Sequence, residues 1–514
     1  LRPSGSRCNA GNGLGRDAPP ARCSDSEHRA PAWHRAAWRF GKLARPLGSA
    51  VARPDDAQMP RHLPLLRTLA LLVVAHLPSQ APSSPAPSAP VPTRRGTELR
   101  ELTRAAADQV VAIPTSSQHG LAATPDGVLW ALVLRAEQVS ADRASKDGSD
   151  LEIWTSADRG GHWTHCASAP TAKDHDGALV PYGDGVTLAW TAAAGGGLSN
   201  VYTQHYSVAK AQWLGEPVPL TASTGEQDQY FQPDIEATAD GTLVVAFGCH
   251  RAPQRGPWRS GWSTGLRWRA PGRDTWAEVV QANVSTHGVS GTLAAHGAMV
   301  DVVYRTNPGQ AILGLRTLHP ASGTFAEEQD HPATAALVGS EPIANVAALA
   351  IDAQGGRTVL HVLGGDEPGE GRLAVSFAPA GAAGPGAFVT RELCADPPLV
   401  GGNANPRHFV LCRGPGNLIH AYFAKAEEGY AALWHCALTE GQPAFAPQRV
   451  AEGGADAFVM LSGNRCAATT STAHLLVLGR PERNPGGVVS VFGSWPAQTT
   501  VTAKARTSRP AAGR

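Results

Sequence analysis

One pattern recurs along most of this chain and constrains its fold more than any other feature. It consists of an apolar run, a tight turn that contains glycine, and a second apolar run. GLAATPDGVLWALVL at 120–134 and DIEATADGTLVVAFG at 234–248 are clear copies, whereas the copy at 459–479 has lost its glycine turn. The copies recur about every 56 to 60 residues, which indicates a fold built from similar supersecondary units. The turns fall near residues 126, 184, 240, 296, 355, 415 and 472.

An aromatic residue ends each repeat, and the turns within the repeats predict hairpins. Asp-Gly and Gly-Gly between alternating apolar runs are hairpin signals, so two hairpins per repeat predict a four-stranded antiparallel sheet. We therefore predict an all-β fold, a β-propeller of four-stranded antiparallel blades over 108–496. Seven blades are favoured and six are the alternative, because the last copy is degenerate. The segment 108–113 is expected to supply the outer strand of the last blade. The closing aromatics are Trp163, Trp213, Trp276, Phe325, Phe388, Phe445 and Trp495.

The composition agrees with this fold and excludes one class of partner. The 514 residues include 56 glycines and 41 prolines, and 42% are hydrophobic, as expected of a turn-rich β protein with a large core. The net charge of +1 argues against a dedicated nucleic-acid surface.

The ends of the chain differ from the repeats. Residues 1–58 are arginine-rich and aperiodic, and we interpret them as sequence upstream of the true start or as a disordered extension. Residues 59–81 have the basic start, short apolar run and small residues of a secretory signal peptide, and the run is too short for a stable membrane span. We predict a Pro/Ser/Ala-rich linker over 82–107 and a disordered basic tail over 497–514. The protein is thus expected to be secreted or otherwise extracytoplasmic, in the periplasm or outside the cell.

The stretch TSADRGGHWTH at 155–165 contains Ser156, Asp158, Gly160 and Trp163 at the spacing S-x-D-x-G-x-x-W. Ser and Asp side chains bond to backbone groups of a turn, glycine accepts a positive φ, and tryptophan packs between sheets. The motif resembles the Asp-box, or BNR repeat, of sialidase-like β-propellers. That resemblance implies a structural role, on the face opposite the active site.

The predicted strand order A–B–C–D divides the propeller into two faces. The first strand of each unit begins at one face, which also carries the B–C and D–A connections; we call it the loop face. The A–B and C–D turns lie at the opposite face, the turn face. Since fold alone does not give function, the functional residues are to be sought on the loop face.

A sialidase-like site would need arginines for the substrate carboxylate and an aspartate acid/base, as the resemblance implies. Ser117 stands where the first arginine would be, which argues against a true exo-sialidase. The B–C segment 135–150 offers Asp147 and Asp150 as weak catalytic candidates.

Histidines precede the first strands of several units. Imidazoles that converge on one axis with a carboxylate suit a divalent metal ion or general acid/base catalysis. The alternative is that they line a wet channel. The candidates for catalysis and for the metal are His119, His175, Asp234, His287 and His408.

Two long loops on the same face have the composition of a saccharide site. Carboxylates bond sugar hydroxyls, aromatic rings stack on sugars, and arginine forks clamp carboxylate or sulfate groups. The alternative for the Trp/Arg loop is packing onto its neighbour. The candidates for ligand binding are Glu226, Asp228, Tyr230, Arg251, Arg255, Trp258, Arg259 and Trp262.

We therefore expect a protein that recognises a carbohydrate through its loop face, and the arginines favour an anionic one. As an enzyme it would be a glycan-cleaving hydrolase or metal-assisted lyase. The alternative is a non-catalytic binding or scaffold propeller. The expected partners are a carbohydrate or glycoconjugate, with no nucleic acid and a monomeric protein.

Overall fold

The computed structural model describes somewhat more than half of the chain, and the described residues form strands joined by turns and short loops. No helix that could cross a membrane occurs among them. The described residues are 99–104, 109–114, 119–140, 143–158, 160–171, 173–195, 198–223, 229–251, 261–282, 289–306, 312–326, 347–363, 372–382, 387–394, 409–414, 417–427, 430–443, 446–453, 460–463, 472–479 and 488–496.

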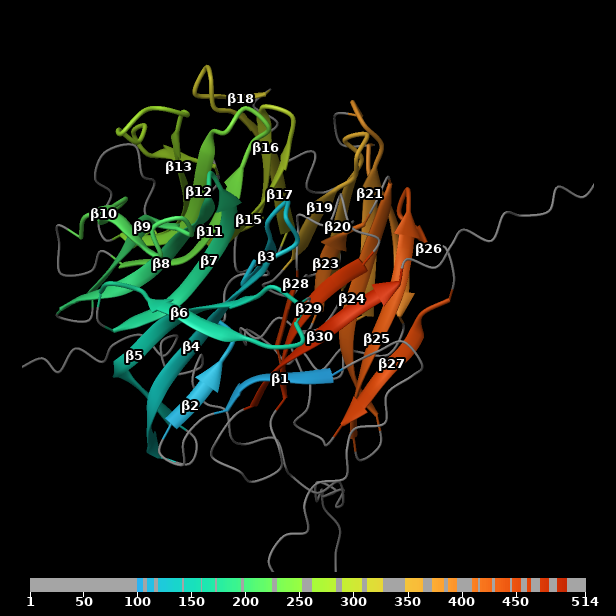
Figure 1. The fold of residues 1–514 in the computed structure, drawn as a ribbon. Helices are drawn as coiled ribbons and strands as arrows, with labels where there is room; N and C mark the ends of the chain where they lie inside the picture. The colour runs from blue at the N-terminus through green and yellow to red at the C-terminus, as the bar shows by residue number, and fades with distance from the viewer. Residues whose placement is uncertain are drawn as a thin grey trace, which may run out of the picture.

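The strands form consecutive antiparallel units that follow the sequence repeats (Figure 1). Unit 1 contains β2 (Gln109–Ala112), β3 (Leu121–Ala123), β4 (Leu129–Ser140), β5 (Arg143–Ser156) and β6 (Thr164–Ser168). Unit 2 contains β7 (Asp174–Tyr182), β8 (Gly185–Gly195), β9 (Leu198–Ser207) and β10 (Gln212–Pro219). Unit 3 contains β11 (Gln229–Ala237), β12 (Leu243–Arg251), β13 (Gly261–Arg269) and β14 (Val280–Gln281). Units 2 and 3 join into one sheet because Gln229 of β11 pairs with Ser199 of β9.

The later units repeat the same order of strands. Unit 4 contains β15 (Val289–His296), β16 (Met299–Thr306), β17 (Ile312–His319) and β18 (Thr324–Ala326). Unit 5 contains β19 (Ala348–Ile351), β20 (Arg357–Leu363), β21 (Arg372–Ala378) and β22 (Val389–Cys394). Unit 6 contains β23 (Phe409–Arg413), β24 (Leu418–Glu427), β25 (Tyr430–Thr439), β26 (Gln442–Pro443) and β27 (Gln448–Gly453). Unit 7 contains β28 (Met460–Gly463), β29 (Thr472–Gly479), β30 (Val488–Pro496) and β1 (Leu99–Arg104).

The units are arranged in a ring, which confirms the predicted all-β propeller fold. The first strand of each unit contacts the first strand of the next, in the order β3, β7, β11, β15, β19, β23 and β28, and β28 contacts β3 again. Successive sheets pack face to face. On β12, for example, Val245 and Phe247 pack towards unit 2, whereas Val244 and Ala246 pack towards unit 4. The hydrophobic core is therefore divided into layers between neighbouring sheets.

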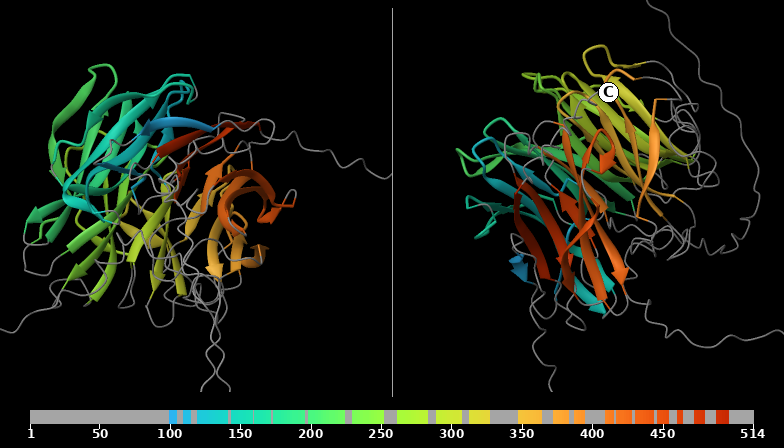
Figure 2. Two further views of the ribbon diagram at one scale, coloured as in Figure 1. Left: turned by 90° about the horizontal axis from the view of Figure 1, so that it is seen from below. Right: turned by 90° about the vertical axis from the view of Figure 1, so that its right-hand side faces the viewer.

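The ring closes with β1, and this corrects one sequence prediction. β1 pairs antiparallel with β30, with Leu99 opposite Phe492 and Arg104 opposite Val488 (Figure 1; Figure 2). The strand therefore lies within 82–107, which the sequence assigned to a linker. The segment predicted for this role, 108–113, instead contains β2, which pairs with β4 of unit 1. Residues 1–98 and 497–514 lie outside the described part of the chain.

β2 belongs to unit 1 because β4 is long enough to pair with two short strands along one edge. β3 pairs only with residues 129–131 of β4, whereas β2 pairs with residues 134–137. The two short strands thus share the inner edge of one long strand. The interval between them contains His119, where the regular ladder is interrupted.

Candidate functional site

The inner strands of units 1 to 4 are irregular near the loop face. Unit 1 has the interruption between β2 and β3, and the pairing of β7 with β8 shifts between Asp174 and Asp176. The pairing of β11 with β12 shifts between Phe231 and Asp234, and that of β15 with β16 between Val289 and Thr292. Such irregularities redirect side chains and are enriched near active sites.

The bulge in β11 places Asp234 on the axis of the ring. Gln232 has a φ of 51°, an unusual backbone conformation for a residue with a side chain, and Pro233 follows it. Strain of this kind persists where the surrounding structure determines it, and it is concentrated at functional sites. The local backbone is thus shaped to present the residues that follow Pro233.

His119 and Asp234 meet in this region although they belong to different units. Nδ1 of His119 is in direct contact with Oδ1 of Asp234, and both side chains are almost completely buried. The Asp234 carboxylate also accepts hydrogen bonds from the backbone N–H of Leu293, at 2.7 Å, and of Ile235, at 3.0 Å. The pair connects units 1, 3 and 4, and backbone bonds hold a buried carboxylate that would otherwise be costly.

Glu236 lies two residues beyond Asp234 and hence on the same face of β11. Its side chain is buried, and this burial raises its pKa to about 8, with a smaller contribution from the charge of Asp234. The backbone N–H groups of Ala237, at 3.0 Å, and of Ala295, and the charge of Arg413, act in the opposite direction. Glu236 is therefore mostly a neutral acid at pH 7.

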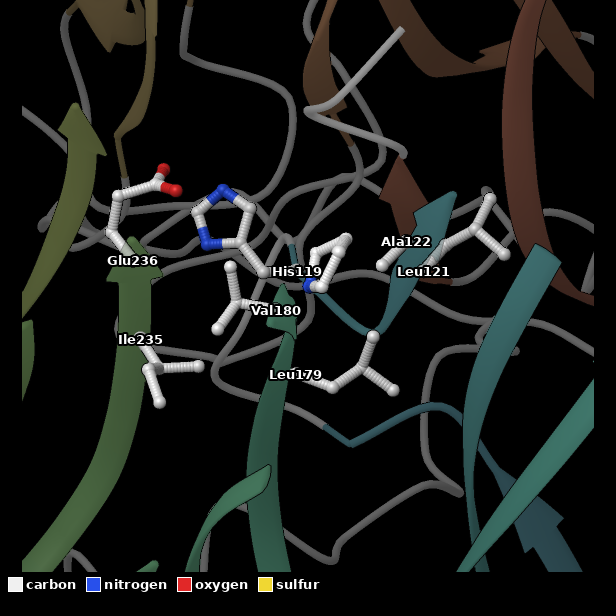
Figure 3. Close-up of a pocket in the computed structure, with 8 residues that line it drawn as sticks. His119, Leu121, Ala122, Leu179, Val180, Ile235 and Glu236 are labelled. Carbon is white, nitrogen blue, oxygen red and sulfur yellow. The ribbon is translucent and has the colours of Figure 1, made fainter. Parts of the chain in front are cut away.

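A small pocket lies between these groups (Figure 3). Its walls come from the inner strands of units 1, 2 and 3, and the Glu236 carboxyl group points towards the His119 imidazole (Figure 3). The volume of the pocket that a water molecule can occupy is about 10 Å³, which is about what one water requires. A sugar ring does not fit into it. The lining residues are His119, Leu121, Ala122, Leu179, Val180, Pro181, Ile235 and Glu236.

The other predicted channel histidines do not join this pair among the described residues. His175 lies on β7, and its Nδ1 is 2.8 Å from the carbonyl oxygen of Lys173. Across the described residues, no group of three or more His, Cys, Asp or Glu side chains is arranged to hold a metal ion. His287 and His408 lie outside those residues, so the predicted metal site on all five candidates stays a prediction.

A second ionisable group lies where units 1 and 2 meet. Asp174 is fully buried, its Oδ1 accepts a 2.6 Å hydrogen bond from Thr171, and the Trp190 indole donates to the same hydroxyl. The pKa of Asp174 is raised to about 7, mainly by burial and to a smaller extent by the charge of Asp150, while the hydrogen bond from Thr171 acts in the opposite direction. Asp150, a weak candidate from the sequence, is exposed on β5. A buried acid beside an exposed carboxylate can exchange protons near neutral pH.

One predicted ligand-binding residue is corrected by the structure. Tyr230 is only 2% exposed, and its ring packs edge-on against Phe247 at 6.0 Å. Its ring belongs to the core between units 2 and 3, so it is not available to stack on a sugar. The composition of this segment does not show which residues of β11 point into the core, so the burial of Tyr230 could not be predicted from it.

Most of the remaining site predictions are untested. Asp147, Arg251 and Trp262 lie in β5, β12 and β13, but the positions of their side chains are outside the described structure. Glu226, Asp228, Arg255, Trp258 and Arg259 lie outside the described residues altogether.

The stretch that resembles an Asp-box forms a tight turn between β5 and β6. Ser156 donates to Asp158 at 2.8 Å and accepts from the backbone N–H of Gly160 at 2.7 Å. Gly160 has a φ of 88°, and Trp163 packs against the core between units 1 and 2. Asp158 accepts from the backbone N–H of His162, which helps to hold its pKa well below the ordinary value. Side chains of this stretch thus bond to the backbone of the turn itself.

Sequence reasoning missed Glu236 and Asp174, although a signal was present for both. Glu236 follows Asp234 at the two-residue spacing of one strand face, in the string DIEA. Asp174 immediately precedes the candidate His175. Neither the burial of these carboxyl groups nor the bulges beside them could be read from that spacing.

Comparison with known proteins finds only distant similarities, all to solved structures. No protein-family model matches the chain, and no curated protein matches it in sequence. Solved structures do resemble it. A polysaccharide lyase matches at 11% identity over 74% of this chain and 91% of its own, with a TM-score of 0.45. The α-L-arabinanase of Penicillium chrysogenum, solved with arabinobiose, matches at 10% identity over 80% and 99%, with a TM-score of 0.43.

A sialidase from Trypanosoma rangeli matches at 10% identity over 78% of this chain and 60% of its own, with a TM-score of 0.40. All three TM-scores lie below 0.5, so these similarities assign neither a family nor a substrate to this chain.

Proposed function

We propose that this protein is an exported β-propeller that binds a carbohydrate at its loop face. The observation that supports this most directly is the irregularity of the inner strands of units 1 to 4 at that face. Buried ionisable groups lie beside three of these irregularities, namely His119, Asp174 and Asp234. Ligand sites are concave surfaces with a few convergent polar groups, and the loop face is where such groups gather.

The turn face offers few free polar groups in the turns described below, which also favours the loop face as the binding surface. Its turns use their polar side chains for their own backbone. Thr238 bonds to Asp240 and to the carbonyl of Thr242, and Asp352 accepts from the backbone N–H of Gly356 at 2.8 Å. Short turns whose hydrogen bonds are satisfied internally offer little for a ligand to bind.

A saccharide would lie above the axial pocket, because the pocket has room for only one water. The predicted loop residues Glu226, Asp228, Arg251, Arg255, Trp258, Arg259 and Trp262 are proposed to contact it. An anionic saccharide is favoured by the four tryptophan and arginine positions between 255 and 262.

Cleavage of the saccharide is a second candidate function, and Asp174 is the residue that favours it. Its pKa of about 7 suits a general acid, and Asp150 provides a second carboxylate nearby. Because Asp174 is fully buried, in this version the exposed Asp150 would give its proton to the leaving oxygen and would regain a proton from Asp174. Replacement of Asp174 by Asn would then abolish cleavage without abolishing binding.

Binding can be tested with the purified protein and a panel of neutral and anionic oligosaccharides, by calorimetry and by product analysis. We expect an anionic oligosaccharide to bind, and Arg259→Ala and Trp258→Ala each to weaken that binding at least tenfold. Asp158→Asn, at the turn face, is the control and should bind as the wild type does. If no saccharide binds, or if D158N weakens binding as much as R259A, the proposed site is wrong.

Export is proposed from residues 59–81 alone. Expression of the full chain in a secreting host, followed by mass spectrometry of its N-terminus, tests it. We expect cleavage after a small residue near the end of this segment. An intact N-terminus and retention in the cytoplasm would contradict export.

A further inference from the structure

We propose that Glu236, His119 and Asp234 form one proton-sharing cluster on the axis, in which Glu236 remains protonated at neutral pH and binds one ordered water together with His119. The cluster would couple protonation to the packing of the inner strands. This inference does not depend on the carbohydrate function.

The positions of Glu236, Asp234 and His119 support the proposed cluster. Glu236 and Asp234 project from the same face of β11, and the imidazole of His119 is in contact with Asp234 while the Glu236 carboxyl points towards it (Figure 3). All three side chains are buried. Two carboxylates and a single imidazole in so small a space cannot all be ionised cheaply, because a net buried charge is costly.

The surroundings then decide which group keeps the proton. Asp234 accepts the backbone N–H groups of Leu293 and Ile235 as well as the imidazole, and such donors favour the ionised form. Glu236 also accepts backbone N–H groups, from Ala237 and Ala295, and lies near the charge of Arg413 on β23, but its burial, together with the charge of Asp234, outweighs these influences. The residues of β7 that line the pocket, Leu179, Val180 and Pro181, carry no charge. The proton therefore belongs on Glu236.

The pocket provides the place for the water. It has about the volume that one water requires, and its polar walls are the side chains of His119 and Glu236. Buried waters are bound where two or more polar groups can reach them, and this pocket meets that condition. A water here would extend the connection between β11 and the start of β3.

The direction of the pH effect follows from the raised pKa of Glu236. Its pKa in the unfolded chain is close to 4.5, and in the folded protein it is about 8. The stabilising effect of the proton is fully present below pH 4.5 and is lost progressively as the pH rises towards 8. Replacement by glutamine, which is neutral at every pH, removes this loss.

Infrared spectroscopy tests the protonation. At pH 7 we expect the wild type to show a carbonyl band of a protonated carboxylic acid that is absent from Glu236→Gln. In the wild type this band should disappear with a midpoint near pH 8. Because Asp174 is also a buried acid, the comparison is repeated in the Asp174→Asn background, which removes its band. If E236Q leaves the spectrum at pH 7 unchanged, Glu236 is ionised and the proposal is overturned.

Two further measurements complete the test. The melting temperature of E236Q relative to the wild type should rise steadily between pH 5 and pH 8, whereas the exposed control Glu216→Gln should show a constant difference. A high-resolution crystal structure of the wild type should show one water between Glu236 and His119. A flat difference for E236Q, or a dry pocket, would each contradict the proposed cluster.

Discussion

Arg135 of β4 donates through Nη2 to the hydroxyl of Thr103 on β1, at 3.1 Å. The same guanidinium donates through Nε to Glu152, at 2.7 Å. The strand that closes the last unit is thus connected through its side chain to the first unit. Ring closure therefore depends on this contact as well as on the backbone pairing of β1 with β30.

Thr103→Val should weaken this closure. Valine keeps the shape of threonine but gives Arg135 no acceptor, so we expect a loss of about 1 kcal/mol in the free energy of unfolding. Urea denaturation followed by tryptophan fluorescence measures it. Thr439→Val, at an exposed position, is the control and should change little. Equal losses in the two variants would mean that the Arg135–Thr103 bond contributes nothing specific.

Removal of the Asp234 carboxylate should destabilise the protein strongly. Asp234→Ala leaves the imidazole of His119 and the backbone N–H of Leu293 without their acceptor, so we expect a loss of about 3–5 kcal/mol. Asp234→Asn retains one acceptor oxygen and should cost less. His175→Ala, outside the cluster, should be close to the wild type in the same denaturation experiment. A D234A variant as stable as H175A would show that the contact between His119 and Asp234 does not stabilise the fold.

Acid should destabilise unit 6 through a buried pair of histidines. Nδ1 of His420 lies 2.9 Å from Nε2 of His435, and both rings stack near Tyr422. Burial lowers the pKa of His420 to about 4 and that of His435 to about 3. Their native forms are therefore neutral, and stability that is complete above pH 6.5 is lost as the pH falls towards these values.

Replacement of His435 by glutamine tests this acid sensitivity. Glutamine can still form a hydrogen bond but does not titrate, so the variant should lose less stability than the wild type between pH 6.5 and pH 4. Each histidine changes the free energy of unfolding by at most about 1.4 kcal/mol per pH unit. Thermal melts across this range measure it, and His165→Gln, at an exposed position, should retain the wild-type slope. Parallel curves for H435Q and the wild type would contradict the assignment.

The turn at 156–160 should be sensitive at two positions for different reasons. Ser156→Ala removes the acceptor for the Gly160 N–H, at a cost of about 1–2 kcal/mol. Gly160→Ala introduces a side chain at a φ of 88°, which costs about 1–2 kcal/mol in an L-residue. Ser168→Ala, at an exposed position, is the control in thermal melts. Neither change at the turn should alter saccharide binding, because the turn lies at the turn face.

The sequence predicts the fold well because the fold depends on local signals that repeat. Glycine turns such as that at Gly241, with a φ of 83°, and apolar runs such as Val244 to Phe247 are visible in most of the single repeats. Repetition then makes each local prediction more secure. β1 escaped prediction because its pairing with β30 is non-local and no local pattern distinguishes it from a linker.

The candidate site was only partly predictable, for a related physical reason. His119 and Asp234 could be named because each lies near the start of an inner strand. Their direct contact depends on the interruption before β3 and on the bulge at Gln232, which are backbone irregularities without a clear sequence signal. The pKa values of Glu236 and Asp174 depend on burial, which is a property of the assembled ring. Tyr230 was misassigned for the same reason, since its strand turns the ring into the core.

The closing position of β1 has a consequence for the order of events during synthesis. β1 is the first strand of the described structure and its partner β30 is the last, so β1 leaves the ribosome long before β30 exists. Until then it is an exposed edge with unpaired backbone groups, which invites association with other chains. The pairing of β1 with β30 also forms slowly, because the two strands are far apart in the sequence. The growing chain therefore needs protection of its N-terminal strand until translation is complete, and any nascent fragment that ends before Val488 cannot complete its last sheet.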